Sequence, residues 1–207
     1  MMIESAHAAP LLIFDLDGTL YRTESSFIRT MRRVYEDHGV AHPGDEAILA
    51  MVGETFDTLL DWLVPQGFRI GRSELQDEIG RVELEAIRRH GELYDGVPET
   101  LRELARRGCA LTLCTNGDRR YVDAVMTRGG IGDLMRENPD RLPIMVGDRY
   151  HDVAAARANG CTMVGASYGY AREGELTAAD ACIGSFGELP DIVFRLAGVR
   201  RAPRRRA

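Results

Sequence analysis

Runs of apolar residues mark five short strands along the chain. The runs lie at 11–15, 109–114, 142–146, 161–164 and 181–183. Short, continuous apolar runs bounded by turn residues are typical of strands that are buried on both faces, as in a parallel sheet. Apolar residues at helical spacing lie between most of them. Strands that alternate with helices predict an α/β fold with a doubly wound, Rossmann-like parallel sheet.

The stretch 21–93 carries only helical patterns. Apolar periodicity predicts helices near 25–38, 45–52, 56–63 and 73–90, the last with Ser73 and Gln76 as a capping box. We therefore expect an all-helical domain at 21–93, inserted into an α/β core built from residues 1–20 and 94–199. The basic tail at 200–207 is expected to be a disordered, solvated terminus.

Composition limits the classes of partner. The formal net charge of −6 argues against general binding of nucleic acid. No apolar run is long enough to span a bilayer, so no membrane partner is expected. The N-terminus lacks a secretion signal, and the four cysteines show neither metal spacing nor disulfide density. We therefore expect a cytoplasmic protein. All 26 basic residues are arginine, and the chain contains no lysine.

Polar residues follow three of the expected strands. They are Asp15 and Asp17, Thr115 and Asn116, and Asp148 with Asp152. Because the carboxyl ends of parallel strands share one edge, these residues can converge in the crevice where α/β sheets bind ligands. Carboxylates beside hydroxyl and amide groups suit Mg²⁺, and an aspartate there can attack phosphorus. Taken alone, Asp15 and Asp17 could also be capping acids at a turn, and the other two clusters in the right order make a site the preferred interpretation.

The run Asp15-Leu16-Asp17-Gly18-Thr19-Leu20 resembles the first motif of the haloacid dehalogenase superfamily. The run from Gly147 to Asp152 resembles its fourth motif, and the helical block at 21–93 resembles its type 1 cap. The overall layout, over about residues 11–196, is most similar to phosphoglycolate-phosphatase-like enzymes. The resemblance implies a Mg²⁺-dependent phosphatase that acts on a small phosphorylated metabolite, a phosphomonoester, through an aspartyl-phosphate.

The resemblance also implies a role for each site residue. Asp15 would be the nucleophile and a metal ligand. Asp17 would be the general acid and base, with its backbone carbonyl on the metal. Thr115 and the Asn116 backbone would hold the phosphoryl group. Asp148 would be the acidic metal ligand, and Asp152 would hold the metal's water shell.

The chain departs from the family pattern in one region. The family has a third-motif lysine between the second and fourth motifs, and this chain has none. The interval between residues 117 and 142 is also short, so we expect the core to lack one strand there. Arg128, Arg136 or Arg141 could replace the lysine, although an arginine in such a position is more often a solvated surface charge. The alternatives are a weak or catalytically silent binding protein, an incomplete variant, or a phosphomutase.

Overall fold

The computed structural model describes residues 9–135 and 143–199 and is built on a five-stranded parallel sheet. The strands are β1 (Leu11–Phe14), β2 (Ala110–Leu113), β3 (Pro143–Gly147), β4 (Thr162–Ala166) and β5 (Ala181–Ile183). Their order in the sheet is β2-β1-β3-β4-β5, and every neighbouring pair is parallel. The predicted parallel α/β fold is confirmed, with each strand within two residues of its expected bounds.

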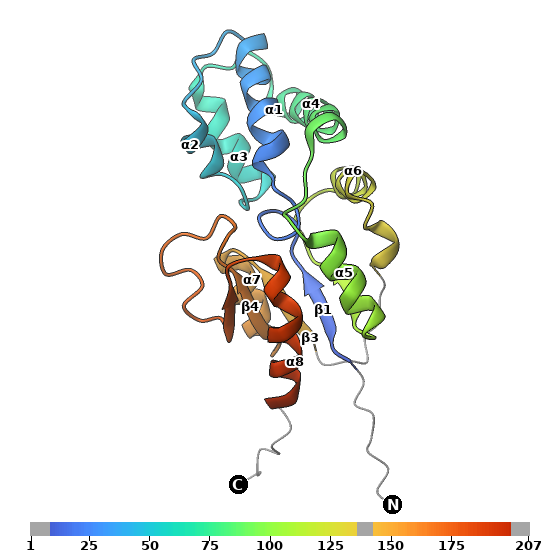
Figure 1. The fold of residues 1–207 in the computed structure, drawn as a ribbon. Coiled ribbons are helices and arrows are strands. Elements are labelled where there is room, and N and C mark those ends of the chain that lie inside the picture. The colour runs from blue at the N-terminus through green and yellow to red at the C-terminus, as the bar shows by residue number, and fades with distance from the viewer. Residues whose placement is uncertain (1–8, 136–142, 200–207) are drawn as a thin grey trace, which may run out of the picture.

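Helices cover both faces of the sheet (Figure 1). Leu12, Phe14 and Val146 belong to the core shared with α5 (Val97–Arg106), α6 (Arg119–Gly129) and α8 (Leu189–Val199). On the other face, Ile13 and Met145 pack with α7 (Tyr150–Ala158). Successive strand residues point to opposite faces, so a strand covered on both sides is apolar throughout. This arrangement accounts for the continuous apolar runs in the sequence.

Four helices form a separate group at one end of the molecule (Figure 1), which we call the helical unit. They are α1 (Glu24–Asp37), α2 (Asp45–Leu49), α3 (Phe56–Leu63, continued by the 3₁₀ turn Val64–Gln66) and α4 (Arg72–His90). The unit has its own apolar cluster, centred on residues such as Met31, Leu60 and Ile79. It therefore buries apolar surface without using the sheet.

The prediction of a capping box at the start of α4 is wrong. The helix begins at Arg72, with Gly71 at its N-cap and no side-chain cap. The Arg72 guanidinium donates to the Asp57 carboxylate at 3.0 Å and also pairs with Asp61, both on α3. Contacts between helices, rather than a local cap, accompany the first turn of α4.

Two antiparallel linkers join the helical unit to the sheet. The Arg22 N–H donates to the Glu92 carbonyl at 2.9 Å, and the Tyr94 N–H donates to the Leu20 carbonyl at 3.0 Å. The chain therefore enters and leaves the unit at one place, directly beyond the carboxyl end of β1.

The interval before β3 adds no strand in the part that the structure describes. Through residue 135 it contains α6 and a 3₁₀ turn, Gly132–Leu134, while residues 136–142 lie outside the described ranges. β2 pairs only with β1 among the described strands and stands at the edge of the sheet. This agrees with the expected loss of one strand beside β2.

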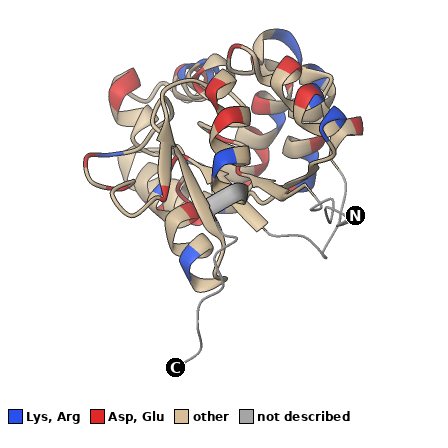
Figure 2. Ribbon diagram, turned by 60° about the horizontal axis from the view of Figure 1, so that its bottom comes forward, with Lys and Arg blue, Asp and Glu red and all other residues tan. Residues whose placement is uncertain are grey.

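Among residues 9–135 and 143–199, none of the helices combines the length and the apolar character that crossing a bilayer requires. Figure 2 shows acidic and basic positions interspersed over the helices rather than gathered by sign.

Packing of the helical unit can be tested with two neighbouring residues. Leu63 is fully buried, whereas Val64 is 40% exposed. We expect Leu63→Ala to lower the free energy of unfolding by about 2–5 kcal/mol, because it leaves a cavity. Val64→Ala, the control, should change it by roughly 0.5 kcal/mol or less. Urea denaturation measures both, and equal losses would contradict a packed core at Leu63.

Candidate active site

The loops after β1 and β3, together with the first turn of α7, bring three carboxylates together. Ligand atoms of Asp15, Asp148 and Asp152 all lie within 4.8 Å of one another. Asp15 comes directly after β1, and its N–H donates to the Val146 carbonyl of β3 at 2.9 Å. The parallel register of β1 and β3 thus places the two strand ends side by side. Asp152 contributes an atom to this cluster, and the water-shell role expected for it from the sequence stays a prediction.

Asp148 is fully buried and only partly satisfied. Its Oδ2 accepts a hydrogen bond from the Tyr170 N–H at 2.5 Å, whereas its Oδ1 is buried without a partner among the described residues. Burial raises the pKa of Asp148 to about 7. Positions 18 and 169 have no room for a side chain, because a Cβ on Gly18 or Gly169 would lie 2.2 or 2.4 Å from Asp148 Oδ2.

The other two carboxylates share this crowding. Burial, followed by the charges of Asp152, Asp17 and Asp148, raises the pKa of Asp15 well above its usual range. Asp152 Oδ2 accepts the Arg149 N–H at 2.9 Å, and a Cβ on Gly147 would lie 2.2 Å from Asp152 Cγ. Glycine at 147 therefore makes room for the Asp152 side chain.

This donor set fits a hard divalent cation. Three carboxylates repel one another when ionised, and Asp148 Oδ1 has no hydrogen-bond donor in the described structure. Mg²⁺ prefers oxygen ligands and is commonly held by one or two carboxylates together with waters. A bound cation would both coordinate Oδ1 and offset the repulsion.

Asp17 points to a different set of partners. Its Oδ1 accepts hydrogen bonds from Thr23 Oγ1 at 2.7 Å and from the Tyr121 hydroxyl. Burial raises the pKa of Asp17, and these two hydrogen bonds oppose that rise. Asp17 therefore has hydrogen-bond donors of its own and lies next to the three-carboxylate cluster without being part of it.

Thr115 and Asn116 follow β2 by two and three residues. The Thr115 hydroxyl accepts the Gly117 N–H at 3.1 Å, which closes a tight turn before α6. Asn116 Nδ2 donates to the Glu54 carbonyl of the helical unit at 3.3 Å. Both residues stand at the same sheet edge as Asp15, because β2 and β1 pair in parallel.

Comparison with protein families matches this arrangement. A family model described as haloacid dehalogenase-like hydrolase matches residues 12–137, more than half of the chain. The chain belongs to the haloacid dehalogenase-like hydrolases. A second, HAD-hydrolase-like model matches residues 120–189 of this hydrolase.

Relatives of this hydrolase include phosphoglycolate phosphatases. One from Haemophilus influenzae is 28% identical over 196 positions, which cover 77% of this chain and 86% of the relative. One from Vibrio vulnificus is 29% identical, with 89% and 96% covered. The Haemophilus alignment takes in about 159 of our 207 residues (77%), so about 37 of its positions (196 less 159) have no residue of this chain. This agrees with a shortened chain.

Solved structures share the fold. A predicted phosphoglycolate phosphatase from Haemophilus somnus superposes with a TM-score of 0.78 at 23% identity, covering 91% of this chain and 99% of that one. CbbY from Rhodobacter sphaeroides, solved in complex with phosphate, gives 0.72 at 19% identity, covering 87% and 96%.

Of the three arginines that could replace the lysine, only Arg128 lies among the described residues. Arg128, at the end of α6, donates through Nε to the Gly91 carbonyl of the linker at 3.1 Å. Its described hydrogen bond is therefore to the linker and to none of the site carboxylates. Arg136 and Arg141 lie outside the described residues, so that hypothesis stays a prediction.

A different arginine lies beside the site. Arg149 follows Asp148, and its side chain is only 4% exposed. Its Nε pairs with Glu175 at 3.0 Å and its Nη2 with Glu54 at 3.2 Å, while Nη1 donates to the Val52 carbonyl. Arg149 thus joins the loop after α2 of the helical unit to the core.

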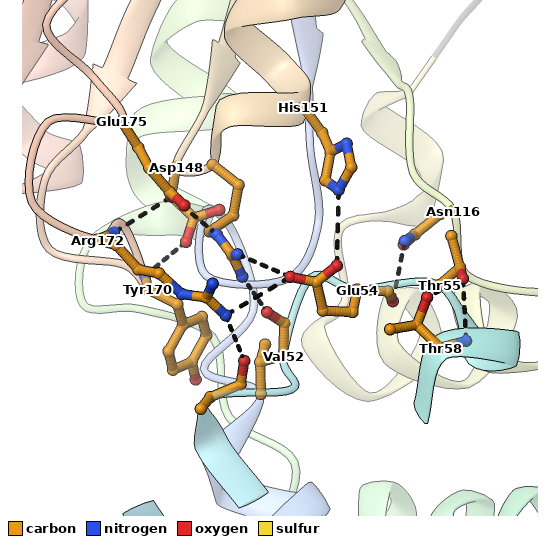
Figure 3. Close-up of polar contacts among 12 residues, drawn as sticks. Val52, Glu54, Thr55, Thr58, Asn116, Asp148, His151, Tyr170, Arg172 and Glu175 are labelled. Carbon is orange, nitrogen blue, oxygen red and sulfur yellow. Dashed lines mark hydrogen bonds and ion pairs between the residues drawn. The ribbon is translucent and has the colours of Figure 1, made fainter. Parts of the chain in front are cut away.

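Glu54 is the centre of this contact (Figure 3). Arg172 Nη2 lies 3.6 Å from its Oε1, and His151 Nε2 lies 3.9 Å from its Oε2. Arg172 also donates to the Ala50 carbonyl at 2.9 Å. Sequence reasoning missed Arg149 and Glu54, because nothing in the sequence pairs residues 95 positions apart.

A further carboxylate comes from the helical unit. Glu83, on α4, is half-buried, and burial, followed by the charges of Asp17 and Asp118, raises its pKa from 4.5 to about 8. α4 packs against α6, the helix that carries Tyr121. Glu83 therefore adds another acidic group to the neighbourhood of Asp17.

This raised pKa predicts a pH-dependent stability. A carboxyl group with a folded-state pKa above its unfolded value stabilises the fold below the unfolded pKa, and that stability is lost as pH rises through the folded pKa. We expect the melting temperature of Glu83→Gln to equal that of the wild type near pH 4.5 and to exceed it at higher pH. The difference should stop growing beyond about pH 8. Thermal denaturation from pH 4.5 to 9 measures this. A constant difference over the range would contradict it.

Proposed function

We propose that this hydrolase is a Mg²⁺-dependent phosphatase that cleaves a small phosphomonoester through an aspartyl-phosphate on Asp15. The observation that carries the proposal is the buried Asp148 Oδ1 without a hydrogen-bond partner among the described residues, inside a cluster of three carboxylates. A cation would stabilise a site of this kind, and a cation beside Asp15, which can act as a nucleophile, suits phosphoryl transfer. The phosphoglycolate phosphatases among the relatives support the same reaction class.

In the first step, an Asp15 carboxylate oxygen attacks phosphorus, and the bond from phosphorus to the leaving oxygen breaks. Asp17, protonated, gives its proton to that oxygen, so the alcohol leaves neutral. The Thr115 hydroxyl and the Asn116 N–H would hold the phosphoryl oxygens. Mg²⁺, held by Asp15 and Asp148 with Asp152 beside it, would neutralise charge on the phosphoryl group.

In the second step, the Asp17 carboxylate takes a proton from water, and the water oxygen attacks phosphorus. The bond from phosphorus to Asp15 breaks, which releases phosphate and restores the Asp15 carboxylate. Asp17 ends protonated, as it began. A phosphomutase would differ only in the acceptor, a sugar hydroxyl in place of water.

We also propose that the helical unit acts as a cap over this site. Asn116, in the phosphate-holding turn, already contacts Glu54 of the unit, and Arg149 holds Glu54 from the side of Asp148. The two contacts connect the position of the unit to residues on both sides of Asp15.

The missing lysine lowers the expected rate. Loss of one electrostatic contact to a developing charge reduces catalysis by roughly 10²–10³-fold. The chemistry stays the same, so weak but metal-dependent turnover is expected.

Phosphate release from a panel of small phosphomonoesters, with and without Mg²⁺, tests the proposal. We expect Mg²⁺-dependent turnover that Asp15→Asn lowers by about 10³-fold or more, because the nucleophile is lost. Asp77→Asn, at an exposed position on α4, is the matched control and should keep wild-type activity. A folded protein that binds Mg²⁺ without turnover would instead support the binding-protein alternative.

Metal binding can be tested separately from turnover. Since burial raises the pKa of Asp148 to about 7, its ionised form at pH 8 opposes folding when no metal is present. Asp148→Asn should therefore raise the melting temperature without Mg²⁺ and remove the increase that Mg²⁺ causes in the wild type. Asp77→Asn should keep that increase. A full Mg²⁺-induced increase in Asp148→Asn would exclude Asp148 as a ligand.

A further inference from the structure

We infer that Tyr121 is a positioning residue that orients the Asp17 carboxyl group for protonation of the leaving oxygen. The inference rests on the proposed function of Asp17. It adds a residue from α6, whereas the other site residues lie on the loops after β1, β2 and β3 and on the first turn of α7.

The geometry of the hydrogen bonds is specific. Tyr121 and Thr23 both donate to Oδ1 of Asp17, one from α6 and the other from the residue that precedes α1. Neither hydrogen bond uses Oδ2. With two donors on Oδ1, the proton of the neutral acid belongs on Oδ2, and that oxygen is the one that serves the leaving group.

Three neighbours determine where Tyr121 lies. Asp118, the N-cap of α6, accepts the Tyr121 N–H at 2.9 Å. Gly117 leaves space for the ring, since a Cβ there would lie 2.8 Å from Tyr121 Cδ1. The Tyr21 ring meets it edge-on, with centroids 6.3 Å apart. The turn that carries Thr115 and Asn116 is therefore the same turn that fixes Tyr121.

The need for such donors follows from the charges nearby. Asp17 stands beside carboxylates, and the chain has no lysine to attract its charge. Hydroxyl donors restrain a carboxyl group in either protonation state, because Oδ1 accepts a hydrogen bond in both. Tyr121 and Thr23 thus keep Asp17 oriented through a catalytic cycle in which it gains and loses a proton.

The test compares two leaving groups. For an alkyl phosphate the departing oxygen needs a proton, whereas p-nitrophenolate leaves readily without one. The ratio kcat/KM reports formation of the aspartyl-phosphate, the step in which the leaving group departs. We expect Tyr121→Phe to lower kcat/KM by about 10–100-fold on the alkyl ester and by less than about 3-fold on p-nitrophenyl phosphate, a fraction of the full effect of general acid catalysis.

Tyr21→Phe is the matched control. It removes a buried tyrosine hydroxyl that donates to Ser26 at 2.7 Å rather than to Asp17, and its ring packs against Tyr121. Tyr21→Phe should change kcat/KM by the same factor on both esters. Thr23→Val, which removes the second donor, should show the same leaving-group pattern as Tyr121→Phe; α1 has no side-chain cap from Thr23 to lose.

Equal losses on both esters in Tyr121→Phe, in an active and folded protein, would overturn this inference and leave the phosphatase proposal intact. A wild-type protein that releases no phosphate from either ester would overturn the proposed function and the role of Tyr121 with it. Circular dichroism and the Mg²⁺-induced rise in melting temperature should match the wild type in each variant.

Discussion

Mutual repulsion among aspartates at the carboxyl ends of β1 and β3 is the constraint on which the rest of the structure depends. Asp15, Asp148 and Asp152 are close enough to share a ligand, and each lies where burial penalises the ionised form. Glycines at 18, 147 and 169 let the chain pass within contact distance of these carboxylates. The crowding of the carboxylates is unfavourable without a cation. The same cation would therefore stabilise this edge of the sheet and take part in the reaction.

Charged side chains also attach the helical unit to the core. Arg149 lies next to Asp148, and its charge lowers the pKa of both Asp148 and Asp152 while its side chain pairs with Glu54 and Glu175. A buried guanidinium needs such partners, because an unpaired buried charge is costly. The acids it needs come from the helical unit and from the loop after β4, so the contact between the two parts is made at the site itself.

The helix that follows the Thr115–Asn116 turn supplies a side chain to the site. α6 follows the Thr115–Asn116 turn directly, and its first turn carries Tyr121. In a chain without lysine, the described groups that lower the pKa of Asp17 are hydroxyl donors rather than a cation.

The sequence by itself determined the strands, the parallel sheet, the helical stretch and the residues at the strand ends. These follow from hydrophobic periodicity and from the rule that parallel strands share one carboxyl edge, both of which are local or topological. Two contacts came from tertiary structure without any signal in the sequence: Arg149 meets Glu54, and Tyr121 reaches Asp17. These contacts span 95 and 104 residues. Such pairs are set by how helices pack, and the same packing replaced the capping box expected at Ser73 with the contacts of Arg72 to α3.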